Sequence, residues 1–192
     1  MIITPPSPGD VTGHAAEMYQ DDLDEDGFVF AHTQAMAMNP EAHQAFEALI
    51  RAVVPSIGTR VYEAATLGAA RAIGSSHCTL AHGRRSVRIG VLDEAGLAAF
   101  ADGDDSAFTV AEQAVIRYAE RLSTDAAAMT DADTQALRDA GFSDRQIVDI
   151  TLAAAARNAF SRALLALAVP VEDVPGLDPA VAAALAGTPR RT

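Results

Sequence analysis

The residues best suited to chemistry lie in one short segment around the only cysteine of the chain. Gly74 breaks a predicted helix, and Ser75 or Ser76 is well placed to cap the next helix with its hydroxyl. Cys78 then falls at the second or third helical position, where unpaired N–H groups and the helix dipole favour a thiolate. His82 follows four residues later, on the same helix face. The pattern predicts an activated thiol nucleophile.

Two other interpretations of Cys78 stay open on the residues alone. A single cysteine in an alanine-rich helix is often a small, inert, buried hydrophobe. Cys78 and His82 can also act as two metal ligands, if His77, Glu63 or a distant histidine completes the set. We nevertheless expect no metal ion and no cofactor. The remaining histidines are expected at surface or structural positions: His14, His32 and His43.

Two charged residues flank this segment at helical spacing. Glu63 lies on the preceding helix, about 18 Å of helix before Ser75, so spacing alone does not bring it to the thiol. Arg85 shares the face of Cys78, where it can bind a substrate carboxylate or serve as a solvated or inter-helix charge. His77 faces elsewhere on the helix, although its ring can reach the same pocket.

Composition excludes several classes of function. The 14 basic residues are all arginine, and 26 acidic residues give a net charge of -12. A field of this sign opposes binding of nucleic acid and of anionic membranes. The absence of lysine excludes a Schiff-base or P-loop lysine.

Several features predict a cytoplasmic location. The N-terminal residues lack the basic and apolar regions of a signal peptide, and one cysteine cannot form an internal disulfide. The most apolar stretch, Ile150 to Val171, carries Arg157, Asn158 and Arg162, which favour a buried helix over a membrane span.

Hydrophobic periodicity predicts an all-α single domain with about seven or eight helices and no strand. We expect an extended N-terminal arm at 1–12, a helical domain at 13–170, and a C-terminal extension at 171–192 that holds a weak helix and a frayed Arg-Arg-Thr tail. The acidic run Asp21–Asp26 is expected as a solvated turn. The predicted helical segments are 13–23, 28–38, 40–54, 59–73, 76–89, 94–100, 109–122, 131–140, 143–168 and 179–186.

The order of these residues resembles a known family. Glu63, Ser75-Ser76-His77-Cys78 and His82 are similar to the E-x11-C-x2-C-x3-H motif of the alkylhydroperoxidase D and carboxymuconolactone decarboxylase superfamily. Asn39-Pro40, the stretch FTVAEQAVIRYAERL and the stretch ALRDAGFSDRQIVDI also resemble the family, most of all its uncharacterised peroxidase-related subgroup. The resemblance covers roughly 28–169.

The resemblance implies an all-α fold, assembly into trimers or hexamers, and peroxide chemistry. It makes Cys78 the peroxidatic thiol, with Glu63, His77 and His82 as proton-relay partners. Ser75 stands where the family has its resolving cysteine, so an external thiol or Cys78 of another subunit would have to reduce the sulfenic acid. Ser75 is then free to cap the helix and donate a hydrogen bond to the thiolate.

The expected function is one-cysteine peroxide reduction, an antioxidant activity. One alternative is a lyase resembling carboxymuconolactone decarboxylase, which takes a lactone and needs a cation such as Arg85 or Arg84 for the substrate carboxylate. Another is a non-catalytic helical oligomer with an inert cysteine.

Overall fold

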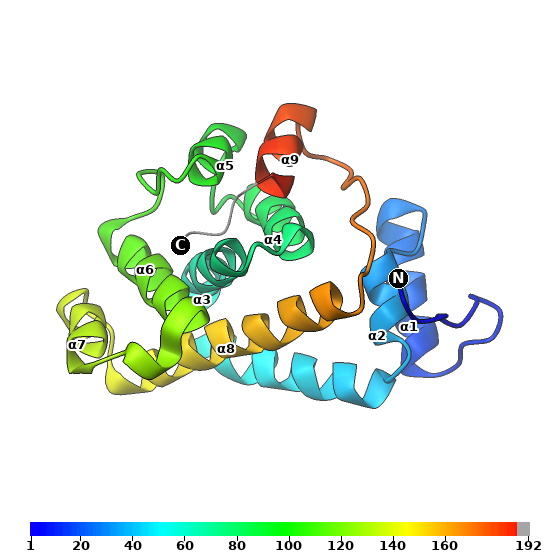
Figure 1. Cartoon of the computed structure of the whole chain (residues 1–192), viewed down its shortest axis with the longest axis horizontal. Helices are drawn as coiled ribbons and strands as arrows, with labels where there is room; N and C mark the ends of the chain where they lie inside the picture. Colours follow the sequence, from blue (N-terminus) through cyan, green and yellow to red (C-terminus); the bar gives the residue numbers. More distant parts are fainter. Residues whose placement is uncertain (188–192) are drawn as a thin grey trace.

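The computed structural model describes residues 1–187 and is built from helices alone. An all-α chain without strands is thereby confirmed for this part of the sequence, with nine α-helices rather than seven or eight. Figure 1 shows their arrangement. The helices are α1 (His14–Asp26), α2 (Ala31–Met36), α3 (Pro40–Ile73), α4 (Ser76–Arg88), α5 (Glu94–Ala101), α6 (Val110–Asp125), α7 (Asp131–Asp139), α8 (Asp144–Ala166) and α9 (Pro179–Ala186), with a 3-10 turn, Ala126–Ala128, after α6.

The long helix α3 combines two segments that we predicted as separate helices. Its only internal departure from helical geometry among the described residues is Gly58, with φ 78° and ψ 160°. Pro55 sits inside the first half, where its missing N–H weakens the helix just before the bend. Gly58 permits the bend because it tolerates a positive φ without steric cost. The chain therefore changes direction at the predicted position without forming a loop.

The acidic run Asp21–Asp26 was wrongly predicted as a turn. It forms the last part of α1, and Gly27 ends that helix in the left-handed conformation, with φ 79°. Asp26 and Glu25 pair with Arg84 and Arg88 of α4. These ion pairs compensate part of the repulsion within the run, which is why the helix extends through it.

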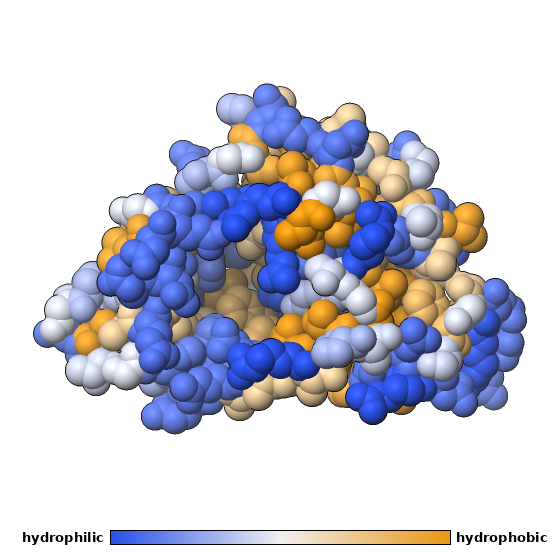
Figure 2. Space-filling view, turned by 180° about the vertical axis from the view of Figure 1, so that it is seen from behind, coloured by the Kyte–Doolittle hydropathy of each residue, from blue (hydrophilic) through white to orange (hydrophobic). Residues whose placement is uncertain are grey.

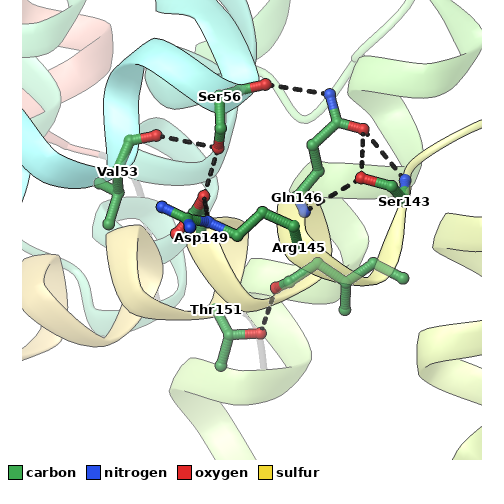
Figure 3. Close-up of polar contacts among 8 residues, drawn as sticks. Val53, Ser56, Ser143, Arg145, Gln146, Asp149 and Thr151 are labelled. Carbon is green, nitrogen blue, oxygen red and sulfur yellow. Dashed lines mark hydrogen bonds and ion pairs between the residues drawn. The ribbon is translucent and has the colours of Figure 1, made fainter.

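Helix starts that carry a cap signal were predicted correctly. Thr109 and Glu112 form a capping box at the start of α6, and Ser143 and Gln146 form one at α8. Figure 3 shows that the start of α8 is also bound to α3: Gln146 donates a hydrogen bond to the Ser56 carbonyl at 3.0 Å, close to the bend. The Ser56 hydroxyl donates to buried Asp149, and Arg145 Nε pairs with the same carboxylate at 2.7 Å.

The core lies where α3 packs against α4, α6 and α8. Small side chains permit close packing there: Ala64, Ala65 and Ala69 of α3 are fully buried. At Gly68 an added Cβ would lie 2.9 Å from the Ile116 carbonyl oxygen of α6, so the backbones of the two helices approach closely there. This packing places the second half of α3 beside α4, α6 and α8.

The two ends of the described chain return to the helical body. The Ile2 amide donates to the Leu167 carbonyl, and Tyr19 donates to the Pro6 carbonyl, so the N-terminal arm lies against the protein. Helix α9 packs on α4 and α5, with Ser76 donating to the Ala186 carbonyl at 2.9 Å. The Arg-Arg-Thr tail lies outside the described residues. None of the described helices has both the length and the apolar character that a membrane span requires.

Candidate active site

A cavity of about 670 Å³ opens between α1, α2, α3, α4 and α8. Figure 2, seen from behind, shows a hollow rimmed mainly by hydrophilic residues with more hydrophobic ones inside. The only cysteine of the chain lines this cavity, and its histidines gather there too. Four of the five histidines line the cavity: His32, His43, His77 and His82. The fifth, His14, contacts His43.

Cys78 is the third residue of α4, at the position predicted from the helix start. Its side chain is only 2% exposed. The Ser161 hydroxyl donates a hydrogen bond to the sulfur at 3.1 Å, and Arg157 Nη1 donates another at 3.5 Å. Both donors come from α8, where they are four residues apart and so share one face. Two donors, one of them charged, stabilise negative charge on the sulfur.

Arg157 places a buried positive charge in the cavity wall. Its Nη2 also donates to the Tyr62 hydroxyl at 3.4 Å, and the guanidinium lies 5.4 Å from the ring centre of Phe160. Burial opposes the charged form, but Cys78 and Tyr62 outweigh it and raise the pKa of Arg157 above its ordinary value. A buried arginine whose hydrogen-bond partners include a thiol and a phenol keeps its charge, so it supplies a fixed positive field beside the sulfur.

Glu63 and His82 form a second group of polar contacts, in which His82 lines the cavity and Glu63 is buried beneath the cavity surface. Glu63 is fully buried, and its Oε2 lies 2.7 Å from His82 Nδ1. Burial and the charge of Arg157 lower the pKa of His82, although Glu63 offsets part of this effect. The imidazole is therefore neutral near pH 7, with Nδ1–H donating to the carboxylate and Nε2 carrying the lone pair. A carboxylate that fixes the tautomer in this way prepares Nε2 to accept a proton.

Antiparallel packing explains how Glu63 reaches this site despite its distance from the helix break. The second half of α3 runs back along α4, so Glu63 lies beside His82 and Arg85 rather than beside the first turn of α4. Among the described hydrogen bonds, none joins Cys78 to His82 or Glu63. Tyr62 lies between the two groups, because it accepts from Arg157 and its ring packs edge-on against His82. Cys78 and His82 both line the cavity.

The serines behave differently from what the residues suggested, whereas the ring of His77 reaches the same cavity as Cys78. Ser75 is the N-cap residue of α4, but its side chain makes no capping bond, and its buried Oγ has no hydrogen-bond partner. Its predicted bond to the thiolate is also absent, since Ser161 provides the hydroxyl contact instead. Ser76 binds α9. His77 lines the cavity, with Nε2 2.8 Å from the Pro170 carbonyl and a buried, unpartnered Nδ1.

The two arginines considered for a substrate carboxylate are both paired. Arg84 makes a two-pronged contact with Asp26, at 2.7 and 2.5 Å. Arg85 Nε lies 2.9 Å from Glu63 Oε1, an ion pair whose geometry is too oblique for a hydrogen bond. Arg85 also lines the cavity and is about half exposed, so it stands at the entrance to the Glu63–His82 pair.

His32, which was expected at a surface or structural position, lines the cavity. Its ring stacks on Phe30 and meets His77 edge-on. Burial, reinforced by His77 and then Arg157, lowers the pKa of His32 from 6.5 to about 4. His32 therefore stays neutral in the folded chain at pH values where the unfolded chain binds a proton.

The depressed pKa of His32 predicts that the folded chain loses stability in mild acid. Because the pKa of His32 is depressed in the folded state, stability is complete above about pH 6.5 and falls as the pH drops toward 4. At about pH 5 the loss is at most about 2 kcal/mol, the value that the shift from 6.5 to about 4 gives at that pH. Urea unfolding near pH 7.5 and near pH 5 measures it. His32→Asn should lose about that much less than the natural chain, and an equal pH dependence of the two would contradict the prediction.

Arg157, Ser161 and Tyr62 were not among the residues that we predicted for the site. A signal for Arg157 exists, because it follows an alanine-rich part of the helix, where a buried charge costs free energy unless it is paired. Ser161 follows it at the same-face spacing. That their partner is Cys78 has no local signal, because 79 residues separate Arg157 from the thiol.

Comparison with known proteins places this geometry in a known fold. No protein-family model matches the sequence, and no curated protein is significantly similar to it. The structure is similar to an uncharacterised peroxidase-related protein with an alkylhydroperoxidase AhpD core from Ralstonia eutropha JMP134, with TM-score 0.73, 21% identity, and coverage of 90% of this chain and 92% of that one. For an uncharacterised peroxidase-related protein from Silicibacter sp. TM1040 the TM-score is 0.67 at 19% identity, covering 81% and 83%.

A further similar structure is that of a cysteine-to-alanine variant of the debrominase Bmp8 in complex with 2,3,4-tribromopyrrole. Its TM-score is 0.73 at 21% identity, and the match covers 96% of each chain. These similarities show that the chain has the AhpD-like all-helical fold, as the motif predicted. The same fold carries both peroxidase-related proteins and a debrominase, so the reaction has to be argued from the site.

Proposed function

We propose that the chain is a thiol-dependent enzyme that reduces a peroxide at Cys78, using an external thiol as reductant. The environment of the sulfur carries the proposal. The only cysteine lies in the first turn of a helix, on a cavity, with Arg157 and Ser161 donating to it. The helix start and the two hydrogen-bond donors favour negative charge on the sulfur, and the thiolate is the attacking species. The similarity to peroxidase-related proteins supports the same reaction class.

The reaction begins with proton transfer from the Cys78 thiol to neutral His82, aided by the peroxide bound between them. The thiolate then attacks the terminal peroxide oxygen: an S–O bond forms, the O–O bond breaks, and sulfur is oxidised to a sulfenic acid. The leaving alkoxide takes the proton back from His82 and departs as an alcohol or as water. Glu63 positions His82 and stabilises its transient positive charge, while Arg157 stabilises the developing negative charge.

An external thiol completes the cycle. It attacks the sulfenic acid, releases water and leaves a mixed disulfide on Cys78, which a second thiol molecule resolves to restore the free cysteine. The cavity of about 670 Å³ leaves room for a small thiol beside Cys78. A disulfide between two Cys78 residues is disfavoured, because a side chain that is 2% exposed at a cavity wall cannot meet its copy in another subunit.

Trapping of the sulfenic acid tests the proposal directly. The native chain receives one equivalent of hydrogen peroxide at neutral pH in the presence of dimedone, and intact mass and peptide mapping report the adduct. One adduct at Cys78 is expected, strongly reduced in His82→Ala and Glu63→Gln. Glu41→Gln, an exposed glutamate on α3, is the matched control and should label normally. A thiol left unmodified by both hydrogen peroxide and an organic hydroperoxide would rule out the peroxidase activity.

The lining of the cavity favours one second candidate, reductive dehalogenation of an aromatic compound. Its apolar part includes Phe46, Ile50, Tyr62, Phe160 and Leu164, which suit a flat ring better than a small peroxide. The similarity to the debrominase Bmp8 supports this reaction. The proton of the Cys78 thiol would add to the ring carbon, by way of His82, while the thiolate takes the halogen as a sulfenyl halide. One external thiol would then displace hydrogen halide and form a mixed disulfide on Cys78, and a second would restore the free cysteine and release the disulfide of the two external thiols. Halide release from a bromopyrrole would distinguish the two.

The lyase interpretation has less support. It needs a free cation for the substrate carboxylate, whereas Arg84 is bound to Asp26 and Arg85 to Glu63.

For the assembly we propose a homo-oligomer, a trimer or hexamer, acting in the cytoplasm, with the helical domain 13–170 as the catalytic unit. Large exposed apolar side chains on α8, at Val148 and Leu152, provide a surface for such contacts.

A further inference from the structure

A second cluster of chemically competent side chains lies on α1 and α3, away from Cys78. His14 Nε2 is 3.1 Å from His43 Nδ1 and 3.7 Å from Glu47 Oε2. His43 Nδ1 and Glu47 Oε2 are 4.0 Å apart. His43 and Glu47 line the cavity, one helical turn apart, whereas His14 is the first residue of α1. Two imidazoles and a carboxylate therefore direct their ligand atoms at one small volume.

We propose that His14, His43 and Glu47 bind a divalent first-row transition-metal ion. Two histidines with one carboxylate are a common protein ligand set for zinc and for non-haem iron, and leave at least one coordination position open. Ligand atoms about 2.0–2.2 Å from a zinc ion lie about 3.4 Å from one another in tetrahedral geometry. The three separations in the structure bracket this value, so only small side-chain movements are needed to close the site.

Two further contacts support this assignment. His14 Nδ1 lies 3.2 Å from Glu17 Oε2, and a metal-binding histidine commonly donates its second N–H to such a carboxylate. With Nδ1 as the donor, His14 Nε2 presents its lone pair toward His43. Two ring nitrogens 3.1 Å apart need a proton or a cation between them, and a metal ion replaces that shared proton.

One neighbouring charge opposes the ion. Arg51 Nη1 lies 3.6 Å from Glu47 Oε2, where it competes for the carboxylate. The Arg51 side chain is two-thirds exposed, so it can rotate into solvent when an ion binds. Occupation of the site would tie α1 to α3, and the open coordination position would border the cavity that also holds Cys78.

Zinc titration by isothermal calorimetry tests the site. The experiment uses the Cys78→Ser chain, because a free thiol would itself bind Zn²⁺. One ion per chain is expected. Loss of a direct ligand in His14→Ala, His43→Ala or Glu47→Gln should weaken binding at least as much as loss of an outer partner does, about 10- to 100-fold, and Glu17→Ala should give the smaller end of that range. Glu41→Gln and His32→Ala are controls, an exposed acid on α3 and a cavity histidine outside the cluster.

Two measurements distinguish the loss of the metal site from the loss of the fold. Arg51→Ala should bind Zn²⁺ more tightly, a gain that loss of structure cannot produce. Zinc should also raise the melting temperature of Cys78→Ser and not that of the His14→Ala double variant. Binding that survives His14→Ala and His43→Ala, or that fails in His32→Ala, would overturn the proposal; the second result would place the ion among the inner histidines instead.

Discussion

Replacing Cys78 with serine is expected to reduce peroxide-dependent oxidation of an added thiol to the uncatalysed rate. A serine hydroxyl is nearly the same size as the thiol, so the hydrogen bonds from Ser161 and Arg157 can persist and the fold should not change. The hydroxyl is not ionised near neutral pH and cannot accept the peroxide oxygen. Consumption of hydrogen peroxide and of an organic hydroperoxide, followed with a small thiol as reductant, measures the effect.

The outcome separates the reactions considered for this site. Peroxide reduction and dehalogenation both need the sulfur and should both disappear in Cys78→Ser, with an unchanged far-UV circular dichroism spectrum as the control for folding. Retained turnover on a lactone would instead point to a reaction that His82 and Glu63 perform without the thiol. A wild-type thiol that reacts with peroxide only after unfolding would indicate an inert buried cysteine, contrary to the proposal.

The helices could be predicted well because their signals are local. Thr109 with Glu112, and Ser143 with Gln146, are capping pairs that need no tertiary information, and both begin helices in the structure. The acidic run Asp21–Asp26 was misassigned because its stability depends on arginines of α4, more than fifty residues away. A break was predicted near Pro55 and Gly58, but whether the chain forms a loop or a bent helix depends on what packs there.

The candidate site likewise contains some contacts that follow from local spacing and others that depend on tertiary packing. Cys78 and His82 are four residues apart on one helix, so their common face follows from spacing, and both line the cavity. The contact between Glu63 and His82 requires α3 to run antiparallel to α4, which spacing within one helix could not show. The resemblance to a known motif indicated Glu63 where the geometry of a single helix did not.

The sequence did not indicate which residues donate hydrogen bonds to the Cys78 sulfur. Ser75 was the natural candidate because it is close to Cys78 in the chain, yet its hydroxyl makes no hydrogen bond among the described residues. Ser161 provides the hydroxyl from α8 instead, together with Arg157. The candidate site therefore combines three helices: α3 carries Glu63, α4 carries Cys78 and His82, and α8 supplies Arg157 and Ser161.

The charge on α8 leads to the second large effect. Arg157→Gln should slow the reaction of native Cys78 with hydrogen peroxide, and with iodoacetamide, by about 10- to 100-fold at neutral pH, because a hydrogen bond to a charged group contributes about 1.5–3 kcal/mol. Glutamine keeps a neutral polar side chain at this position but supplies no positive charge. Arg157→Lys keeps the charge and should recover a large part of the rate, although it lacks the forked geometry that reaches both Cys78 and Tyr62.

Arg162→Gln is the matched control for this prediction. Arg162 lies on the same helix but donates to the Ser123 carbonyl at 2.8 Å and does not line the cavity, so its loss should leave the thiol rate unchanged. Rates measured after unfolding should be equal in all the chains, since no guanidinium is then held near the sulfur. If the thiol of folded Arg157→Gln reacts as fast as in the natural chain, the guanidinium does not stabilise the thiolate, and the activation has to come from the helix start and Ser161 alone.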